Sequence, residues 1–222
     1  MPPSPVRFLF DPISPYARIA WHELPAIAAR HGRSIEPVPV LLAALLDADG
    51  QLGPGEIPSK RRYAFRDALR TARLLGVSLV PPPAHPFNPL LGLRIAALEL
   101  PQPVRNAVID AVFDAVWGGG PGITDSVTLA AFLSARGLAG PQLVAAAGTP
   151  ATKARLRAST SEALEHGVFG VPTMLVEDEM FWGVDSLGHL DRHLAGEQTY
   201  DPVLAATWDA TPAQATRPRA RR

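Results

Sequence analysis

The sequence has no cysteine, and only two of its 222 residues, Lys60 and Lys153, are lysines. Without cysteine the chain can form no disulfide, thiolate nucleophile, zinc–thiolate site or iron–sulfur cluster. Any thiol chemistry therefore needs a thiol that a ligand supplies. The sequence also has no run of 18 apolar residues, and its start, Met1-Pro2-Pro3-Ser4-Pro5, lacks the charged and apolar regions of a signal peptide. We therefore expect a cytoplasmic protein.

An excess of charge of either sign is also absent, since 21 Lys and Arg residues balance 21 Asp and Glu residues. Such a chain creates no field that attracts it to nucleic acid or to an anionic membrane, so we expect neither as a partner. Hydrophobic residues make up 47% of the sequence, which is typical of a globular protein with one large or two small domains. The basic end at 217–222 could contact nucleic acid, but we expect a solvated, disordered tail.

One stretch near the start combines a strand pattern with a helix start. The apolar run Phe8-Leu9-Phe10 breaks at Asp11-Pro12, and a helix pattern begins at Ser14-Pro15. Serine is a favoured N-cap, and proline is favoured at the first helical position because it has no N–H to leave unbonded. The free N–H groups and the dipole of a helix N-terminus also favour an anion or a thiolate beside the cap. Ser14 therefore either only caps the helix or also binds an anionic ligand.

The rest of the pattern predicts an α/β domain that a helical segment interrupts. Strands are expected at 6–10 and 35–40 on either side of the first helix, and Pro37 and Pro39 suit an edge strand. Two short strands, 173–176 and 180–182, are joined by an acidic turn and followed by a last helix at 186–195. Pro25 predicts a kink in the first helix and not its end. Further helices are expected at 41–46, 58–73, 91–100, 104–117, 126–135, 142–147 and 149–166.

This pattern predicts three parts of the chain. The first is an α/β domain formed by residues 1–40 and 167–196. The second is an all-α insertion domain at 41–166. The third is the disordered tail at 197–222.

The βαβ–ββα core with Val171-Pro172 before its third strand resembles the thioredoxin fold. The resemblance implies a cis peptide bond before Pro172 and backbone hydrogen bonds from Val171 to a thiol-bearing ligand. It also places Ser14-Pro15-Tyr16-Ala17 where redox members of that fold carry C-x-x-C. Because neither sulfur is present, disulfide exchange is excluded.

Several groups of residues together resemble the 2-hydroxychromene-2-carboxylate isomerases, relatives of kappa-class glutathione transferases and of DsbA-type proteins. The groups follow the family's order along residues 6–195. They are Phe10-Asp11-x-x-Ser14-Pro15-Tyr16; Gly53-Pro54 with Pro58-x-Lys60-x-x-Tyr63; Arg66-Asp67 with Ala72-x-x-x-Gly76; Pro86-Phe87-Asn88 and Trp117; Gly170-Val171-Pro172-Thr173; and Phe181-Trp182-Gly183-x-Asp185.

This resemblance implies that glutathione is the cofactor, that a small aromatic carboxylate is the substrate, and that the protein is a homodimer. Ser14 would be the catalytic residue, because its hydroxyl can donate a hydrogen bond to the glutathione thiolate, which is the nucleophile. The glutathione-binding residues implied are Val171, Pro172, Trp182, Gly183, Val184, Asp185 and Ser186. The substrate-binding residues implied are Gln51, Lys60, Phe87 and Asn88.

Local chemistry offers alternatives for some of these residues. Asp185 also suits the start of the last helix, Lys60 suits an ordinary surface position, and Phe87 with Asn88 suits packing and turn formation. The chain also departs from the family pattern. It has Gly50-Gln51 where Gly-Asn is frequent, and Val184 and Ser186 where asparagine and arginine are usual, which removes hydrogen bonds to the γ-glutamyl end of glutathione. We expect no metal site, because Leu190 replaces the glutamate of a zinc motif between His189 and His193.

The function implied is a glutathione-dependent cis–trans isomerase of an aromatic enone-type carboxylate, in the catabolism of aromatic compounds. By resemblance, the thiolate adds to the conjugated double bond, the resulting single bond rotates, and elimination restores the alkene in its other geometry. Two alternatives stay open. One is kappa-type glutathione conjugation or peroxide reduction, and the other is a non-catalytic thioredoxin-like domain that binds a peptide or partner at Val171-Pro172.

Overall fold

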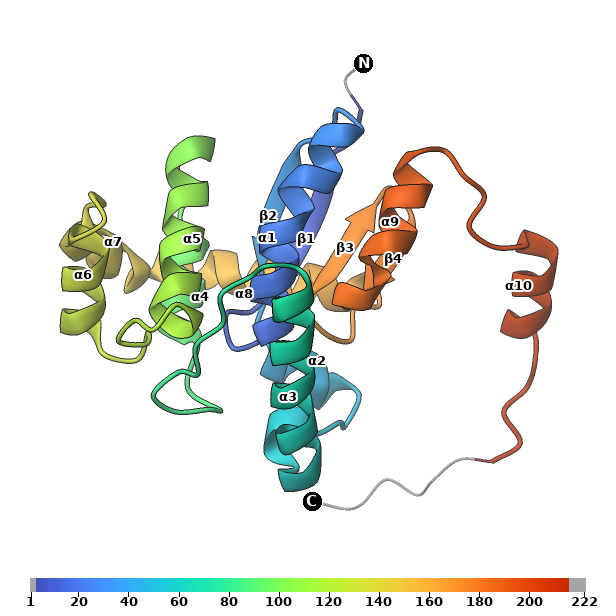
Figure 1. Cartoon of the computed structure of the whole chain (residues 1–222), viewed down its shortest axis with the longest axis horizontal. Helices are drawn as coiled ribbons and strands as arrows, with labels where there is room; N and C mark the ends of the chain where they lie inside the picture. Colours follow the sequence, from blue (N-terminus) through green and yellow to red (C-terminus); the bar gives the residue numbers. More distant parts are fainter. Residues whose placement is uncertain (1–2, 216–222) are drawn as a thin grey trace.

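The computed structural model describes residues 3–215, and a four-stranded sheet lies at its centre (Figure 1). The strands are β1 (Val6–Phe10), β2 (Ile35–Pro39), β3 (Thr173–Val176) and β4 (Glu179–Trp182), in the order β2-β1-β3-β4. Strand β1 runs parallel to β2 and antiparallel to β3. The predicted α/β fold is confirmed. The proline-containing strand β2 lies at an edge, where a missing N–H breaks no ladder in the sheet interior.

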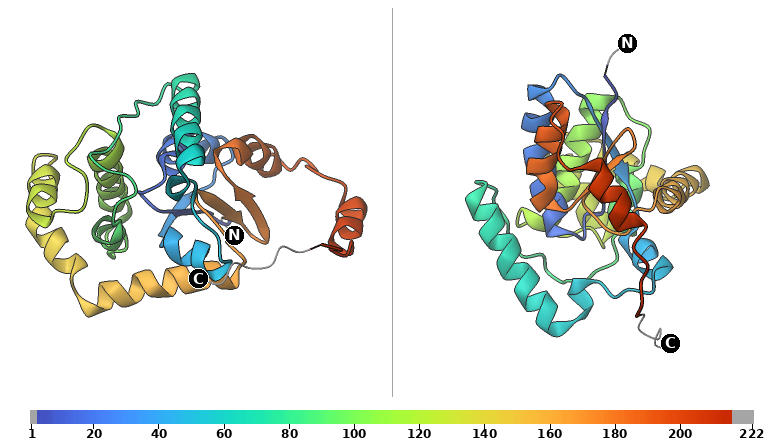
Figure 2. Two further views of the ribbon diagram at one scale, coloured as in Figure 1. Left: turned by 90° about the horizontal axis from the view of Figure 1, so that it is seen from below. Right: turned by 90° about the vertical axis from the view of Figure 1, so that its right-hand side faces the viewer.

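Alternate residues of β1 face opposite sides of the sheet, as the two-residue period of a strand requires. Phe8 and Phe10 are fully buried in the core that helix α1 (Pro15–Arg30) covers, and their rings stack at 5.4 Å. Leu9 faces the other side, where its cluster includes Ala163 of α8 (Pro150–Glu165). The sheet therefore lies between α1 and α9 (Leu187–Leu194) on one side and α8 on the other (Figure 2).

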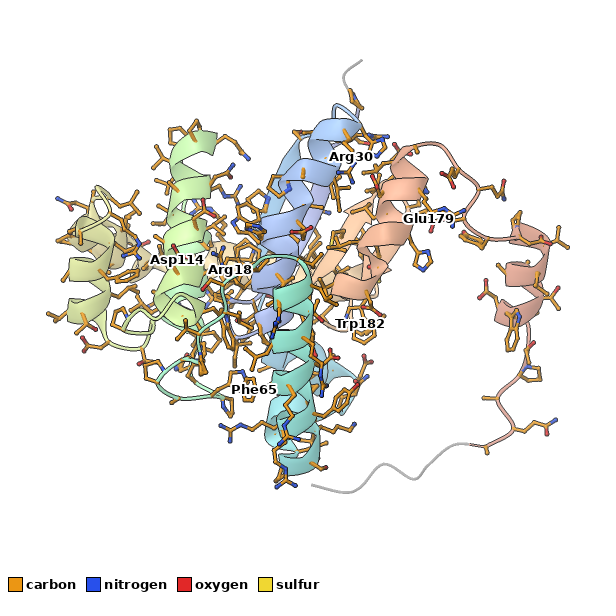
Figure 3. All side chains as sticks on the ribbon, viewed as in Figure 1. Arg18, Arg30, Phe65, Asp114, Glu179 and Trp182 are labelled. Atoms are coloured by element: carbon orange, nitrogen blue, oxygen red, sulfur yellow. The ribbon has the colours of Figure 1, made fainter. Side chains whose placement is uncertain are left out.

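Between β2 and β3 the chain is helical, as predicted. The helices before α8 are α2 (Leu42–Ala48), α3 (Pro58–Leu74), α4 (Leu90–Ala96), α5 (Gln102–Trp117), α6 (Ser126–Ser134) and α7 (Gly140–Ala147), with a 3-10 turn, η1, at Pro54–Glu56. Helix α5 packs beside α1, where Arg18 forms an ion pair with Asp114 at 3.0 Å (Figure 3). One hydrophobic cluster extends from Phe10 through Phe113 to Leu133 of α6. The sheet and the helical segment thus share a core, and their division into two domains stays a prediction.

Some boundaries differ from those predicted. Helix α4 ends at Ala96 and not at residue 100, shortly before Pro101. Residues Val184–Ser186 form a separate 3-10 turn, η2, so that the last helix begins at Leu187. Helix α1 continues through Pro25 to Arg30, so that proline does not end it, as expected.

The segment 197–222, for which we predict disorder, contains the helix α10 (Pro202–Asp209). The Asp201 side chain caps it by accepting hydrogen bonds from two backbone N–H groups, and Pro202 occupies its first position. None of its residues is buried, and α10 lies apart from the rest of the chain (Figures 1 and 2). The basic residues at 217–222 lie outside the described residues. Across residues 3–215, no helix combines the length and the apolar character needed to cross a membrane.

Candidate active site

Ser14 is the N-cap of α1, as predicted, and lies where the chain leaves the carboxyl end of β1. It is buried, its Oγ accepts a hydrogen bond from the Ala17 N–H at 3.2 Å, and its own N–H donates to the Asp11 carbonyl at 3.0 Å. Within residues 3–215, no side chain or backbone group accepts the hydroxyl hydrogen of Ser14, and the backbone N–H of Tyr16 has no acceptor. Two donors at the positive end of α1 are therefore available to an anion.

The start of β3 lies beside this turn. Leu9 pairs with Thr173 in the antiparallel ladder, so the residues just before Thr173 lie next to those just after Phe10. The peptide bond between Val171 and Pro172 is cis, as the resemblance implies. Val171 is partly buried, and its N–H and C=O form no hydrogen bond with any part of the described chain. An extended ligand can pair with such groups as a further strand would.

The chain closes this region on the far side of β4 with the turn η2. The Gly183 N–H donates to the Pro172 carbonyl at 2.9 Å, which fixes the turn against the cis proline. Gly183 has φ of 88°, and a Cβ there would lie 2.3 Å from a carboxylate oxygen of Asp185, so this position requires glycine. The Ser186 hydroxyl donates to the Gly183 carbonyl at 2.8 Å. In this arrangement the Ser186 hydrogen is bonded to Gly183, and its oxygen is free to accept a hydrogen bond from a ligand.

The other residues of this turn have different surroundings. The Val184 side chain packs against the cluster of Ile19 and Ala68, so only its backbone is available to a ligand. The backbone N–H groups of Val184 and Asp185 form no hydrogen bond within residues 3–215. The Asp185 carboxylate is exposed and, among those residues, has no cation within 4.0 Å. Asp185 does not cap α9, because the N-cap is Ser186.

Trp182 and Phe169 form a partly exposed aromatic edge beside Val171. Their rings lie 5.0 Å apart, and Trp182 projects from the end of β4 (Figure 3). A Cβ on Gly170 would lie 2.7 Å from the indole nitrogen of Trp182, so the indole rests directly on the Gly170 backbone. The two rings, tilted by 58°, form an apolar edge next to the cis proline.

Helix α3 faces the first turn of α1 across a hollow of about 440 Å³, lined by Tyr16, Pro54, Ser59, Lys60, Tyr63 and Ala64. The predicted substrate residue Lys60 is thus close to the helix start. The Tyr16 hydroxyl donates to the Asp67 carboxylate at 2.8 Å. Burial and this hydrogen bond raise the pKa of Tyr16, and the negative charge of Asp185 adds to the rise. Tyr16 and Val184 both pack against the cluster of Ile19 and Ala68, so η2 and the hollow lie in one region.

The remaining predicted substrate residues lie in other surroundings. Gln51 is exposed in the loop after α2. Phe87 packs on the core beside His85, with ring centroids 6.0 Å apart, and the Asn88 side chain accepts a hydrogen bond from the Leu90 N–H at 3.0 Å. These contacts match the packing and turn alternative. The roles of Gln51, Phe87 and Asn88 toward substrate stay predictions.

Two neighbours of the turn before Ser14 support its backbone. The Trp117 indole N–H donates to the Pro12 carbonyl at 2.8 Å, and His85 Nε2 lies 3.0 Å from the Ile13 carbonyl, so that this nitrogen carries the hydrogen. Burial lowers the pKa of His85, and the positive charge of Arg61 lowers it further. A neutral His85 therefore holds Ile13. The sequence offers no local signal for this contact, because His85 is 72 residues away from Ile13.

Asp11 is a buried acid to which the sequence motifs assign no role in the site. It is completely buried, and its two carboxylate oxygens accept hydrogen bonds from the N–H groups of Ile13 and Leu42, each at 3.0 Å. Burial raises the pKa of Asp11 to about 7, although both hydrogen bonds act in the opposite direction. Asp11 thus joins the turn before Ser14 to the start of α2. An aspartate that ends an apolar strand is the signal that could have indicated it.

A model of the DSBA-like thioredoxin domain family matches residues 5–195. The chain is therefore a DsbA-like thioredoxin-fold protein, the class to which its sheet order and its cis proline also point. The 2-hydroxychromene-2-carboxylate isomerase of Sphingobium xenophagum is 31% identical over 192 residues, which cover 85% of this chain and 97% of that protein. The isomerase of the same name from Pseudomonas sp. (strain C18) is 33% identical over 195 residues, which cover 86% and 90%.

A solved structure of 2-hydroxychromene-2-carboxylate isomerase superposes with a TM-score of 0.78 at 28% identity, covering 93% of this chain and 99% of that one. The chain belongs to the 2-hydroxychromene-2-carboxylate isomerase family, and the predicted resemblance is confirmed. More distant relatives include glutathione S-transferase kappa 1 of Rattus norvegicus, 24% identical over 91% of this chain and 96% of that protein. The cytosolic disulfide reductase DsbM from Pseudomonas aeruginosa, solved with GSH, shares the fold at a TM-score of 0.60 and 15% identity, covering 93% and 99%.

Proposed function

We propose that this protein is a glutathione-dependent cis–trans isomerase of an aromatic enone-type carboxylate, in which Ser14 stabilises the glutathione thiolate. The observation that carries the proposal is the hydroxyl of Ser14, whose oxygen accepts from Ala17 while its hydrogen has no acceptor in the described part of the chain. Family membership supports the reaction type, since relatives with more than 30% identity are named 2-hydroxychromene-2-carboxylate isomerases.

The residues present fit glutathione, a tripeptide that carries a thiol, two carboxylates and an ammonium group. The unpaired N–H and C=O of Val171 suit its peptide backbone. The free N–H groups of Val184 and Asp185 suit its γ-glutamyl carboxylate, and the unpaired carboxylate of Asp185 suits the ammonium group beside it. When bound, glutathione supplies a thiolate that adds to the conjugated double bond and is eliminated after rotation.

The protein's own groups would favour the ionised thiol and orient the substrate. The Ser14 O–H and the Tyr16 N–H donate to a sulfur anion at the N-terminus of α1, where the helix dipole also favours negative charge. The Lys60 ammonium beside the hollow attracts an anionic group of the substrate or of glutathione. The Tyr16 hydroxyl already donates to Asp67, so it orients α3 and does not protonate the product.

Two Ser/Thr N-cap variants test the role of Ser14. Ser14→Ala and Thr149→Ala each remove a hydroxyl that caps a helix, and either change costs about 1 kcal/mol of stability. Only Ser14→Ala should lower the rate of glutathione-dependent isomerisation, by roughly 10- to 100-fold, because one hydrogen bond to a charged group contributes about 1.5–3 kcal/mol. Equal turnover of Ser14→Ala and Thr149→Ala would remove Ser14 from the mechanism.

Further assays distinguish the two other functions. Conjugation of an aromatic electrophile or reduction of a peroxide, without isomerisation, would favour the kappa-type function. If calorimetry detects no binding of glutathione at millimolar concentration, only the function of a non-catalytic binding domain remains. The homodimer also stays a proposal, which sedimentation equilibrium tests.

A further inference from the structure

Helix α3 concentrates positive charge on one element of a chain that is neutral overall. Its 17 residues contain a single acid, Asp67. They contain six cations, which are Lys60, Arg61, Arg62, Arg66, Arg70 and Arg73. All six cationic side chains are exposed, and Figure 3 shows nitrogen-tipped side chains around the lower part of α3. Four of them, Arg62, Arg66, Arg70 and Arg73, share one side of the helix by their spacing, and we call these four the cationic ridge.

Within residues 3–215, six of the ten arginines outside α3 have a carboxylate partner, whereas the cations of α3 have none. Elsewhere Arg7, Arg18, Arg30, Arg33, Arg155 and Arg192 each form an ion pair. Across residues 3–215, none of the six cations of α3 has a carboxylate oxygen within 4.0 Å. Asp67, the one acid on the helix, accepts its hydrogen bond from Tyr16. The ridge therefore has no ion-pair partner within residues 3–215.

The spacing of the ridge opposes helix stability. Arg62, Arg66 and Arg70 are four residues apart, so their like charges lie on one side of the helix and repel each other. No contact within the described chain compensates for this repulsion. An external anion that binds near the ridge would reduce this repulsion.

The ridge lies on the same helix that lines the hollow. Lys60 and Tyr63 of α3 face Tyr16 there. With a rise of 1.5 Å per residue, Arg66 and Arg70 lie roughly 9 and 15 Å along the helix from Lys60. These separations compare with a Debye length of about 30 Å at 0.01 M salt and about 3 Å at 1 M salt. At low ionic strength the hollow is therefore within the field of the ridge, whereas at high ionic strength it is not.

We infer that the cationic ridge draws anionic ligands to the hollow and strengthens their binding without touching them. This inference rests on the proposed function, because it concerns glutathione, with a net charge of −1 at neutral pH, and carboxylate substrates. Coulomb's law in water gives about a threefold increase in affinity when two charges lie roughly 12 Å from a unit charge of opposite sign. The site thus discriminates by ligand charge as well as by direct contacts, and it favours carboxylates over their esters.

Two double variants, each of which replaces two cations by neutral glutamines, test the ridge. The double variant Arg66→Gln/Arg70→Gln removes two charges from α3. The control Lys153→Gln/Arg157→Gln removes two charges from α8, on the opposite side of the molecule (Figure 2). Calorimetry measures the dissociation constants of glutathione and of glutathione monoethyl ester, whose net charge is zero, at 0.01 M and 1 M salt.

The ridge predicts that Arg66→Gln/Arg70→Gln weakens glutathione binding about threefold at 0.01 M salt and leaves it unchanged at 1 M salt. Binding of the monoethyl ester, which has one negative charge fewer, should weaken less than that of glutathione, and the control on α8 should match the wild type for both ligands. Equal glutathione affinity of the two double variants at low salt would contradict the inferred role of the ridge and leave the proposed function unaffected. Failure of the wild type to bind glutathione would overturn both.

Discussion

The buried carboxyl of Asp11 allows a quantitative prediction of how stability depends on pH. Its pKa is about 7 in the folded protein, against 3.8 for an exposed aspartate. Between these values the folded state keeps the proton and the unfolded state has lost it. Stability therefore falls as pH rises through this window, by about 1.4 kcal/mol per pH unit, and then levels off above pH 7. The loss between pH 4.5 and pH 7 amounts to about 3 kcal/mol.

The variant Asp11→Asn removes this titration and keeps the shape of the side chain. An amide has one acceptor oxygen, so one of the N–H groups of Ile13 and Leu42 loses its partner, at a cost of about 1–3 kcal/mol that does not depend on pH. Urea unfolding from pH 4.5 to pH 8.5 measures the difference between variant and wild type. From pH 4.5 to pH 7 we expect the free energy of unfolding of the variant to rise relative to that of the wild type by about 3 kcal/mol. Above pH 7 the difference should stay constant.

The exposed turn residue Asp178 provides the control, because Asp178→Asn changes the same charge outside the core. Its difference from the wild type should stay within about 0.5 kcal/mol over the whole range. A pH-independent difference for Asp11→Asn as well would refute the reasoning. It would mean that the two backbone hydrogen bonds outweigh burial and keep Asp11 ionised in the fold.

Two further predictions concern the turn η2 and the contact between α1 and α3. Gly183→Ala should lower the free energy of unfolding by about 1–3 kcal/mol and weaken glutathione binding, because φ is 88° and the new Cβ would meet the Asp185 side chain. Urea unfolding and calorimetry measure the two effects. A variant with unchanged stability and unchanged glutathione affinity would contradict this prediction. Tyr16→Phe should keep the isomerase kcat within roughly threefold while costing about 1 kcal/mol of stability, since its hydroxyl bonds to Asp67 and to the Ala64 carbonyl, both on α3. A large loss of kcat without a loss of stability would assign the hydroxyl to the chemistry.

Much of the fold follows from local sequence signals. Serine followed by proline after an apolar strand predicts the start of α1, and the two prolines of β2 predict its edge position. Val171-Pro172 before a short strand predicts the cis peptide, once the fold is identified by resemblance. These features depend on neighbouring residues or on a family pattern, so the sequence alone contains them.

The rest depends on contacts between distant residues. Asp11 is buried because the chain returns at Leu42, and Ile13 is held by His85, and neither pairing leaves a mark in the spacing of residue types. Asn88 shows a second limit. A polar residue in a proline-rich loop suits a ligand contact and a turn equally well, and only the fold reveals its hydrogen bond to Leu90.

The central claim is that Ser14 and the start of α1 hold a thiolate that glutathione supplies. The most direct test is the pKa of the glutathione thiol in its complex with the protein, measured by the ultraviolet absorbance of the thiolate as pH is varied. A hydrogen bond to the sulfur anion of about 1.5–3 kcal/mol predicts a thiol pKa about 1–2 units lower in the wild-type complex than in free glutathione. In Ser14→Ala most of that decrease should be lost. A thiol pKa that is the same for free glutathione, the wild-type complex and the Ser14→Ala complex would contradict the claim.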